Sequence, residues 1–213
     1  MVGLWLFGAS VALLVRAEFG LDPWDVLHQG ISERSGISLG IVVIVTSFVV
    51  LALWIPLRQR PGIGTVANVV LVGLAVDATL AVLPAPTQLS WRIGFLVAVI
   101  LGNGIATGLY IGAGLGPGPR DGLMTGLAAR GISIRLARTA IEITVLGVGW
   151  LLGGTVGFGT VAYALAIGPL AQLFVPLFTI SAPNTPNTPR EASHEVARRS
   201  QQHPPRPSRS THR

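Results

Sequence analysis

Ionisable side chains within apolar segments are the first residues of this chain that could do chemistry. Asp77, Arg138 and Glu142 each lie inside or at the edge of a long apolar stretch. Such groups are costly in hydrocarbon and usually face a partner or a water-filled cavity, where they can carry a proton or hold a substrate. Arg138 and Glu142 are four residues apart, so a purely structural ion pair explains them equally well. Asp77 has no partner nearby in the sequence, which favours a functional role for it.

A second group of polar residues belongs to a motif that occurs twice. GLDPWDVLHQGI at 20–31 returns as GPGPRDGLMTGL at 116–127. In each copy a proline suits the first turn of a helix, and an aspartate follows where the backbone N–H groups and the helix dipole favour a carboxylate. We expect each copy to begin a short helix, and capping alone explains the two aspartates better than a role at a site. The helix-start residues are Asp22, Pro23, Trp24 and Asp25 in the first copy, and Gly116, Gly118, Pro119, Arg120 and Asp121 in the second.

Arg120 breaks the similarity between the two copies, because it stands where the first copy has Trp24. An arginine at the start of a short helix can pair with Asp121, or it can meet an anionic substrate. The pairing with Asp121 is the simpler expectation. The residues that we expect on a substrate or proton pathway are therefore Asp25, Asp77, Arg120, Asp121, Arg138 and Glu142.

Residues for enzymatic chemistry are scarce. The chain has no cysteine and no lysine, and His28 is its only histidine before residue 194. Neither a G-x-S-x-G nucleophile motif nor a phosphate-binding P-loop occurs, and two histidines for a metal site cannot be assembled outside the C-terminal tail. We expect no catalytic residues, no metal site and no cofactor, and we predict that the protein is not an enzyme.

The elements that must position these residues are long apolar segments. Half of the 213 residues are hydrophobic and only 11% are charged, which is too little charge for the surface of a soluble domain. About twenty helical residues cross a hydrocarbon core of about 30 Å. We predict an all-α membrane protein with about six transmembrane helices, drawn from 2–15, 37–57, 63–83, 93–112, 139–156 and 160–180. The first stretch is short, so we expect either a start upstream of Met1 or a shortened helix.

The repeated motif divides the chain into two related halves of three spans each. Beyond the motif, GIS at 36–38 returns at 131–133, and GIGTVA at 62–67 returns as GFGTVA at 157–162. Two consecutive units with an odd number of spans insert in opposite orientations, which predicts inverted repeats related by an axis in the membrane plane. The motif helices are too short to cross the bilayer and should be re-entrant or interfacial. We expect one membrane repeat at 1–90, a second at 91–180, and a disordered arginine- and proline-rich tail at 181–213.

The distribution of arginine predicts the orientation. Twelve of the fifteen basic residues, all arginine, fall on the side of the chain termini, and three fall on the other side. The positive-inside rule therefore predicts a multi-pass membrane protein with both termini in the cytoplasm. Six of these arginines belong to the tail, so the basic pI does not indicate nucleic-acid binding.

Glycine, proline and asparagine predict how the spans pack. Gly104, Gly108 and Gly112 recur every fourth residue, which predicts a smooth face that a neighbouring helix or a second copy of the chain can approach. A second such stripe is expected at Gly149, Gly153 and Gly157. Prolines at 169 and 176 should kink the last span. Asn68 and Asn103 are expected to bond across helices.

The motifs also resemble a known family. The run GLGPGPRDGLMTGLAARGIS, the earlier PWDVL and the later ARTAIEITVLGVGWLLGGTVGFGT are similar to the YczE/YitT-like group of uncharacterised bacterial integral membrane proteins. The resemblance covers about 8–176. It implies a polytopic inner-membrane protein with five or six helices and no settled activity.

Two functional classes fit these features. A small secondary transporter or exporter of a small molecule is favoured, since inverted repeats, interrupted helices and carboxylates within the membrane are its usual parts. Its partners would be the lipid bilayer, a small-molecule substrate and a proton, with a homodimer left open. The alternative is a non-transporting accessory or scaffold protein whose tail binds anionic lipid or an acidic partner.

Overall fold

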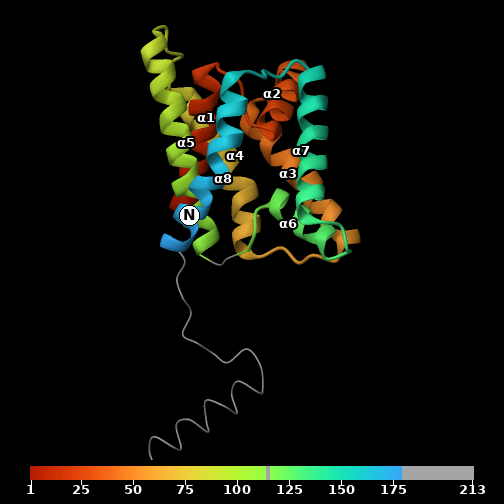
Figure 1. Cartoon of the computed structure of the whole chain (residues 1–213). Coiled ribbons are helices and arrows are strands. Elements are labelled where there is room, and N and C mark those ends of the chain that lie inside the picture. The colour runs from red at the N-terminus through yellow and green to blue at the C-terminus, as the bar shows by residue number, and fades with distance from the viewer. Residues whose placement is uncertain (114–115, 179–213) are drawn as a thin grey trace, which may run out of the picture. The chain divides into compact units, whose positions relative to one another are not determined.

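Eight α-helices make up all the secondary structure in the described residues of the computed structural model, which are 1–113 and 116–178 (Figure 1). The expected tail, 181–213, lies outside them. The helices are α1 (Val2–Ala17), α2 (Pro23–Ser35), α3 (Leu39–Leu57), α4 (Ile63–Val82), α5 (Leu89–Gly112), α6 (Pro119–Ala128), α7 (Ile134–Leu151) and α8 (Phe158–Phe178). The prediction of an all-α protein is confirmed.

Four of these helices, α3, α4, α5 and α8, are long and apolar enough to cross a membrane. The helix α1 is apolar but has 16 residues, against 24 in α5, its counterpart in the repeat that the sequence predicts. The helix α7 has 18 residues and carries two arginines and a glutamate in its first half. Four of the six predicted spans therefore meet the length and hydropathy that a membrane crossing needs.

The predicted boundaries of the fifth span are wrong. The apolar stretch at 139–156 predicts a later helix, but α7 begins at Ile134 and ends at Leu151. An apolar window misses its first turns because they are amphipathic, with Arg135 and Arg138 among apolar residues. Since Gly153 and Gly157 follow the end of the helix, the predicted glycine stripe on this span is also wrong.

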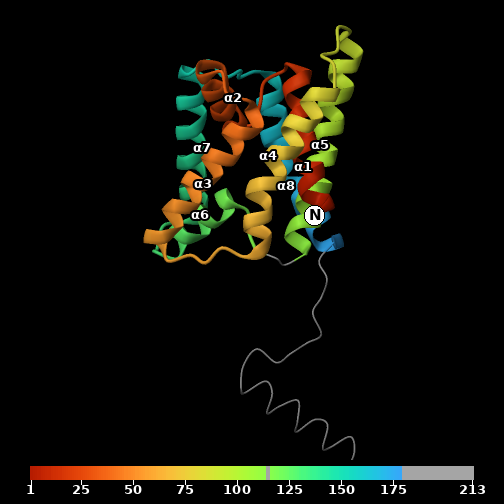
Figure 2. The same cartoon turned by 180° about the vertical axis from the view of Figure 1, so that it is seen from behind.

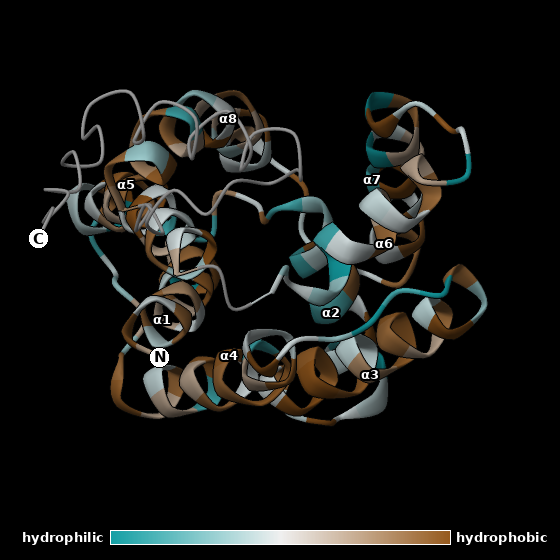
Figure 3. Cartoon of the chain, turned by 90° about the horizontal axis from the view of Figure 1, so that it is seen from below, coloured by the Kyte–Doolittle hydropathy of each residue, from teal (hydrophilic) through white to brown (hydrophobic). Residues whose placement is uncertain are grey.

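The helices pack in two groups that meet along α3 and α4. In the first group α1 packs against α4 and α5, and α5 packs against α8. In the second group α2 packs against α7, and α6 packs against α3. The view from behind shows α3 next to α4 (Figure 2), and the view along the bundle shows α7 and α8 apart (Figure 3). The two short helices lie at different heights, α2 in the upper half of Figure 1 and α6 in the lower half.

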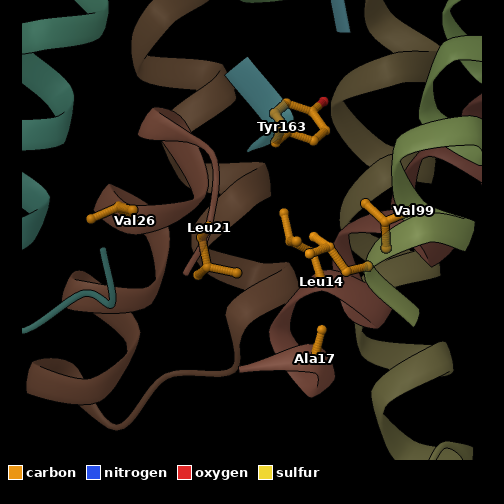
Figure 4. Close-up of a cluster of buried hydrophobic side chains, with 7 residues drawn as sticks. Leu14, Ala17, Leu21, Val26, Val99 and Tyr163 are labelled. Carbon is orange, nitrogen blue, oxygen red and sulfur yellow. The ribbon is translucent and has the colours of Figure 1, made fainter. Parts of the chain in front are cut away.

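The largest apolar core holds α1, α2, α5 and α8 together. Leu14 and Ala17 of α1 pack with Val99 of α5 and Tyr163 of α8, and Leu21 and Val26 extend this cluster to α2 (Figure 4). Large apolar side chains of α3, α4, α5, α7 and α8 are exposed on the outside of the bundle. This inverted distribution is what a lipid-facing surface needs.

Close backbone approaches fix two of the helix pairs. A Cβ added at Gly40 of α3 would lie 2.1 Å from the carbonyl oxygen of Gly73 in α4. Gly104 and Gly108 of α5 lie against Leu170 and Phe174 of α8, so the packing face predicted on α5 is confirmed for these two glycines. The helix α8 continues through both of its internal prolines.

Candidate binding site

The start of α2 is built as the sequence predicts. Asp22 is the N-cap residue, and its Oδ1 accepts a hydrogen bond of 2.7 Å from the backbone N–H of Asp25. Pro23 occupies the first turn. The Asp25 carboxylate is buried and lies 3.1 Å from Nδ1 of His28, one turn later. The two aspartates of this motif therefore both have partners within it.

The start of α6 follows the same plan with different partners. Gly118 is the N-cap residue, Pro119 follows it, and no side chain caps the helix. The Pro119 carbonyl accepts a hydrogen bond of 3.0 Å from Nε1 of Trp54 in α3. Asp121 Oδ2 accepts a hydrogen bond of 2.8 Å from the hydroxyl of Tyr110 in α5. Gly20 and Gly116 precede the two helices with φ of 101° and 114°, a conformation that glycine adopts without strain.

Arg120 connects the two motifs. Its Nη1 lies 3.3 Å from Asp22 Oδ2, although the two residues are 98 positions apart. The expected pairing with Asp121 is wrong, because Asp22 is the partner instead. The guanidinium also lies 5.4 Å from the ring centroid of Phe7 and 6.0 Å from that of Trp24. Arginine over aromatic rings gains cation–π stabilisation, so residues of the first half of the chain hold this arginine of the second half.

The surroundings perturb the charges of this pair. Burial raises the pKa of the Asp22 carboxyl above its ordinary value, the neighbouring Asp25 raises it further, and Arg120 opposes both. Burial lowers the pKa of Arg120, but the carboxylates of Asp22 and Asp25 outweigh that effect, and the net direction is upward. Arg120 therefore keeps its charge, while Asp22 binds a proton more readily than an exposed aspartate does.

Two spaces meet at this pair. A cleft of about 390 Å³ lies between α7 and α8 and reaches inward to Asp22 and Arg120. A smaller cavity of about 40 Å³ lies on the other side, among α1, α2, α3, α4 and α6, with Thr46, Ser47 and Asn68 in its wall. Five residues line both spaces and so form the partition between them: Phe7, Trp24, Tyr110, Arg120 and Asp121.

Arg138 and Glu142 line the cleft from α7. Arg138 Nε lies 2.9 Å from Glu142 Oε1, so the predicted ion pair is confirmed. Across the cleft, Tyr163 of α8 accepts a hydrogen bond of 2.5 Å from the Asn103 amide of α5, which confirms the bond across helices expected of Asn103. Asn68 lies in the wall of the small cavity.

Asp77 lies elsewhere. Its carboxylate accepts hydrogen bonds from the Ser38 hydroxyl at 2.6 Å and from the Gly40 backbone N–H at 2.7 Å, both at the start of α3. Asp77 lines neither the cleft nor the small cavity. Capping of α3 thus accounts for a carboxyl group within the apolar helix α4.

Four residues of the site were not predicted as such from the sequence. Asp22 was expected only to cap a helix, His28 was considered only as a metal ligand, and Tyr110 and Tyr163 were not considered. A tyrosine in an apolar span is a weak signal, because most such residues only pack. The pairing of Arg120 with Asp22 can be predicted only if the two motifs are known to lie together in the fold. In the described residues no three His, Asp or Glu side chains are grouped to hold a metal ion.

Comparison with known proteins places this arrangement in a family. The model of a family of unknown function, DUF6198, matches residues 1–176. The chain belongs to this family. An uncharacterized protein of Haemophilus influenzae is 39% identical over 176 residues, which cover 82% of this chain and 81% of that protein. The uncharacterized membrane protein YczE of Bacillus subtilis is 33% identical over 175 residues, 80% of each chain, and the protein YyaS of the same organism is 24% identical over 183 residues.

No solved structure matches the chain. The resemblance to the YczE-like group is confirmed by the relative of that name. A relative named as a membrane protein, together with four helices that meet the requirements for a membrane crossing, makes this family member a membrane protein.

Proposed function

We propose that this DUF6198 protein is a small secondary transporter or exporter of a small molecule, built from two inverted repeats. The repeats are supported by matched helix pairs. If α1 to α4 correspond to α5 to α8, the pair α1 with α4 matches α5 with α8, and α2 with α7 matches α6 with α3. The contact of α1 with α5 then lies on the pseudo-two-fold axis. Each short helix packs on a longer helix of the other half, α2 on α7 and α6 on α3, as expected for two repeats related by a two-fold axis.

One difference between the halves carries the proposal. The seam between α3 and α4 is closed by the approach of Gly40 to Gly73 and by the hydrogen bonds of Asp77 to the start of α3. The offset of 95 residues between the later parts of the repeats relates Gly73 to Gly168 in α8. Beyond its chain neighbours and its own helix backbone, no described atom lies within 4 Å of a Cβ added at Gly168, and the cleft of about 390 Å³ lies at that seam.

A pair of matched seams, one open and one closed, is what alternating access requires at any one moment. The substrate enters between α7 and α8 and meets the Arg120–Asp22 pair. Opening of the α3–α4 seam and closing of the α7–α8 seam then connects the small cavity to the other side. With both termini in the cytoplasm, as the arginine distribution predicts, the open cleft faces the cytoplasm, because α6 and the N-terminus lie at the same end of the bundle (Figure 1).

The test is flux across a sealed membrane. The full-length protein is reconstituted in liposomes, and a pH-sensitive dye inside reports protons that move with a panel of organic anions, cations and neutral solutes. We expect substrate-dependent flux that Glu142→Gln and Asp121→Asn reduce, with unchanged elution in size-exclusion chromatography. An absence of flux for every solute, from protein that remains folded, contradicts transport and favours the accessory role.

A second experiment tests the cleft itself. The native chain has no cysteine, so cysteines at Arg138 and Gln172 are the only thiols in a double variant. A bifunctional maleimide that bridges them across the mouth of the cleft should stop flux. The same variant treated with a monofunctional maleimide is the control, since it carries the modification without the bridge.

A further inference from the structure

The partition between the cleft and the small cavity contains hydrogen-bond donors that lack a described acceptor. The carboxylates in this region already have partners. Asp22 accepts from Arg120 and from a backbone N–H, Asp25 is paired with His28, and Asp121 accepts from the Tyr110 hydroxyl. Each of these carboxylates therefore has at least one described partner.

Some of the donors lack a described partner. Trp24 is 6% exposed and lines both spaces, and its Nε1 has no hydrogen-bond partner in the described part of the chain. A buried polar group without a partner is destabilising, so such a group often marks a place where a ligand or water supplies the missing acceptor. Arg120 has five N–H donors, and the single described bond, from Nη1 to Asp22, uses one of them. Phe7 and Trp24 place aromatic rings beside the guanidinium, and its remaining N–H donors suit a planar oxyanion.

The charge of the region limits what can bind. Three carboxyl groups, those of Asp22, Asp25 and Asp121, lie around the single guanidinium of Arg120, so an added anion binds more favourably when a proton comes with it. Asp22 is the group whose protonation helps most, because Asp22 competes with an anion for Arg120. The titratable and charged groups that surround it are Asp25 and His28 of α2, Tyr110 of α5, Arg120 and Asp121 of α6, Arg138 and Glu142 of α7, and Tyr163 of α8.

We propose that the inner end of the cleft binds a small carboxylate anion on Arg120 and the Trp24 indole N–H, together with one proton on Asp22. The proton passes from solvent to an oxygen of Asp22, the Asp22–Arg120 ion pair breaks, and the ligand carboxylate takes its place on the guanidinium. The charge of the region is unchanged, since one anion and one proton enter together. This inference names the substrate class of the proposed transporter and rests on that function for its role in transport, but binding is measured without flux.

Benzoate is a suitable probe, because its ring suits a site walled by Phe7, Trp24, Tyr110 and Tyr163. Binding of radiolabelled benzoate to the purified full-length protein is measured by equilibrium dialysis between pH 5.5 and pH 8.5. Benzoate stays ionised throughout this pH range. Uptake of one linked proton weakens binding about tenfold per pH unit above the pKa of the acceptor group.

Variants separate the two parts of the site. Asp22→Asn carries a permanently neutral side chain that still caps α2, so its benzoate binding should lose the pH dependence and keep the affinity that the unmodified protein has at low pH. Arg120→Gln removes the charged donors and should weaken binding about tenfold or more at every pH. Glu18→Gln is the matched control, since Glu18 is an exposed carboxylate paired with Arg92 away from the cleft.

Three results would overturn the inference. One is an absence of benzoate binding, and another is benzoate binding that does not change with pH in the unmodified protein. The third is tight binding of phenylguanidinium that increases in Arg120→Gln, because it would mean that Arg120 occupies a site for cations. Benzoate binding without flux would leave this site in place and contradict transport, whereas flux of another solute without benzoate binding would do the reverse.

Discussion

Replacement of Gly73 by alanine should force open the seam between α3 and α4. A Cβ at this position would lie 2.4 Å from the Gly40 carbonyl oxygen and 2.5 Å from Cγ1 of Ile44. The Ile44 side chain can turn away, but the carbonyl belongs to the backbone of α3. Since ordinary contacts of this kind begin at 3.4 Å, the two helices must separate by about 1 Å.

The cost of this wedge is set by overpacking. Added methyl groups in a well-packed interior cost about 1–3 kcal/mol. If the closed seam alone carries that cost, the equilibrium between closed and open seams moves by about 5- to 150-fold. Gly168→Ala is the matched control, because the proposed repeat relates Gly168 of α8 to Gly73, and no described atom beyond its chain neighbours and its own helix backbone lies within 4 Å of the added Cβ. Each variant adds one methyl group to a glycine within a helix, so comparison of the two separates contacts across the seam from the addition of a methyl group as such.

Thiol labelling measures the opening. Thr46 lies in the wall of the small cavity next to the α3–α4 seam, and a cysteine there is the only thiol in the chain. We expect a membrane-impermeant maleimide to label Thr46→Cys 5- to 150-fold faster in the Gly73→Ala background, and at the original rate in the Gly168→Ala background. Equal labelling rates in the two backgrounds, with both proteins folded, would refute the assignment of α3 and α4 as a seam that opens.

Three other predictions concern stability, which thermal or denaturant unfolding in detergent measures. Asp77→Ala should lower the free energy of unfolding by about 1–2 kcal/mol, and Asp77→Asn by much less, because an amide oxygen still accepts from Gly40; equal losses would contradict the capping role. Gly122→Ala places a methyl group on the Trp54 indole and should cost about 1–3 kcal/mol, whereas Gly147→Ala, with open space around it, should not destabilise the protein. Asn103→Leu should cost about 1 kcal/mol or more by leaving the buried Tyr163 hydroxyl without its donor, and an unchanged midpoint would show that this bond contributes nothing.

Local sequence signals predicted the parts of this fold that depend on neighbours in the chain. The starts of α2 and α6 follow from a proline and an aspartate within a few residues, because helix capping involves only the first turn. The pair of Arg138 with Glu142 follows from one helical turn. Hydropathy did not predict the start of α7 at Ile134. Hydropathy is averaged over a window of residues, and the first turn of α7 is amphipathic.

Contacts between residues far apart in the chain were beyond such signals. Asp77 has partners 37 and 39 positions away, and their identity depends on α4 lying against the first turn of α3. The sequence alone made Asp77 a candidate for proton transfer, because a carboxylate without a local partner looks unpaired. Its carboxylate has two partners once the helices are packed.

The amino-acid sequence by itself determined that this chain is helical, apolar enough for a membrane, and duplicated, because hydropathy, glycine and proline act over short distances and repeat visibly. Only the tertiary structure decided that Arg120 pairs with Asp22 rather than with Asp121, and that α3 and α4 close while a cleft lies between α7 and α8. Both depend on which helices pack together, and the packing free energy that selects among arrangements is a sum of contacts between residues far apart in the chain.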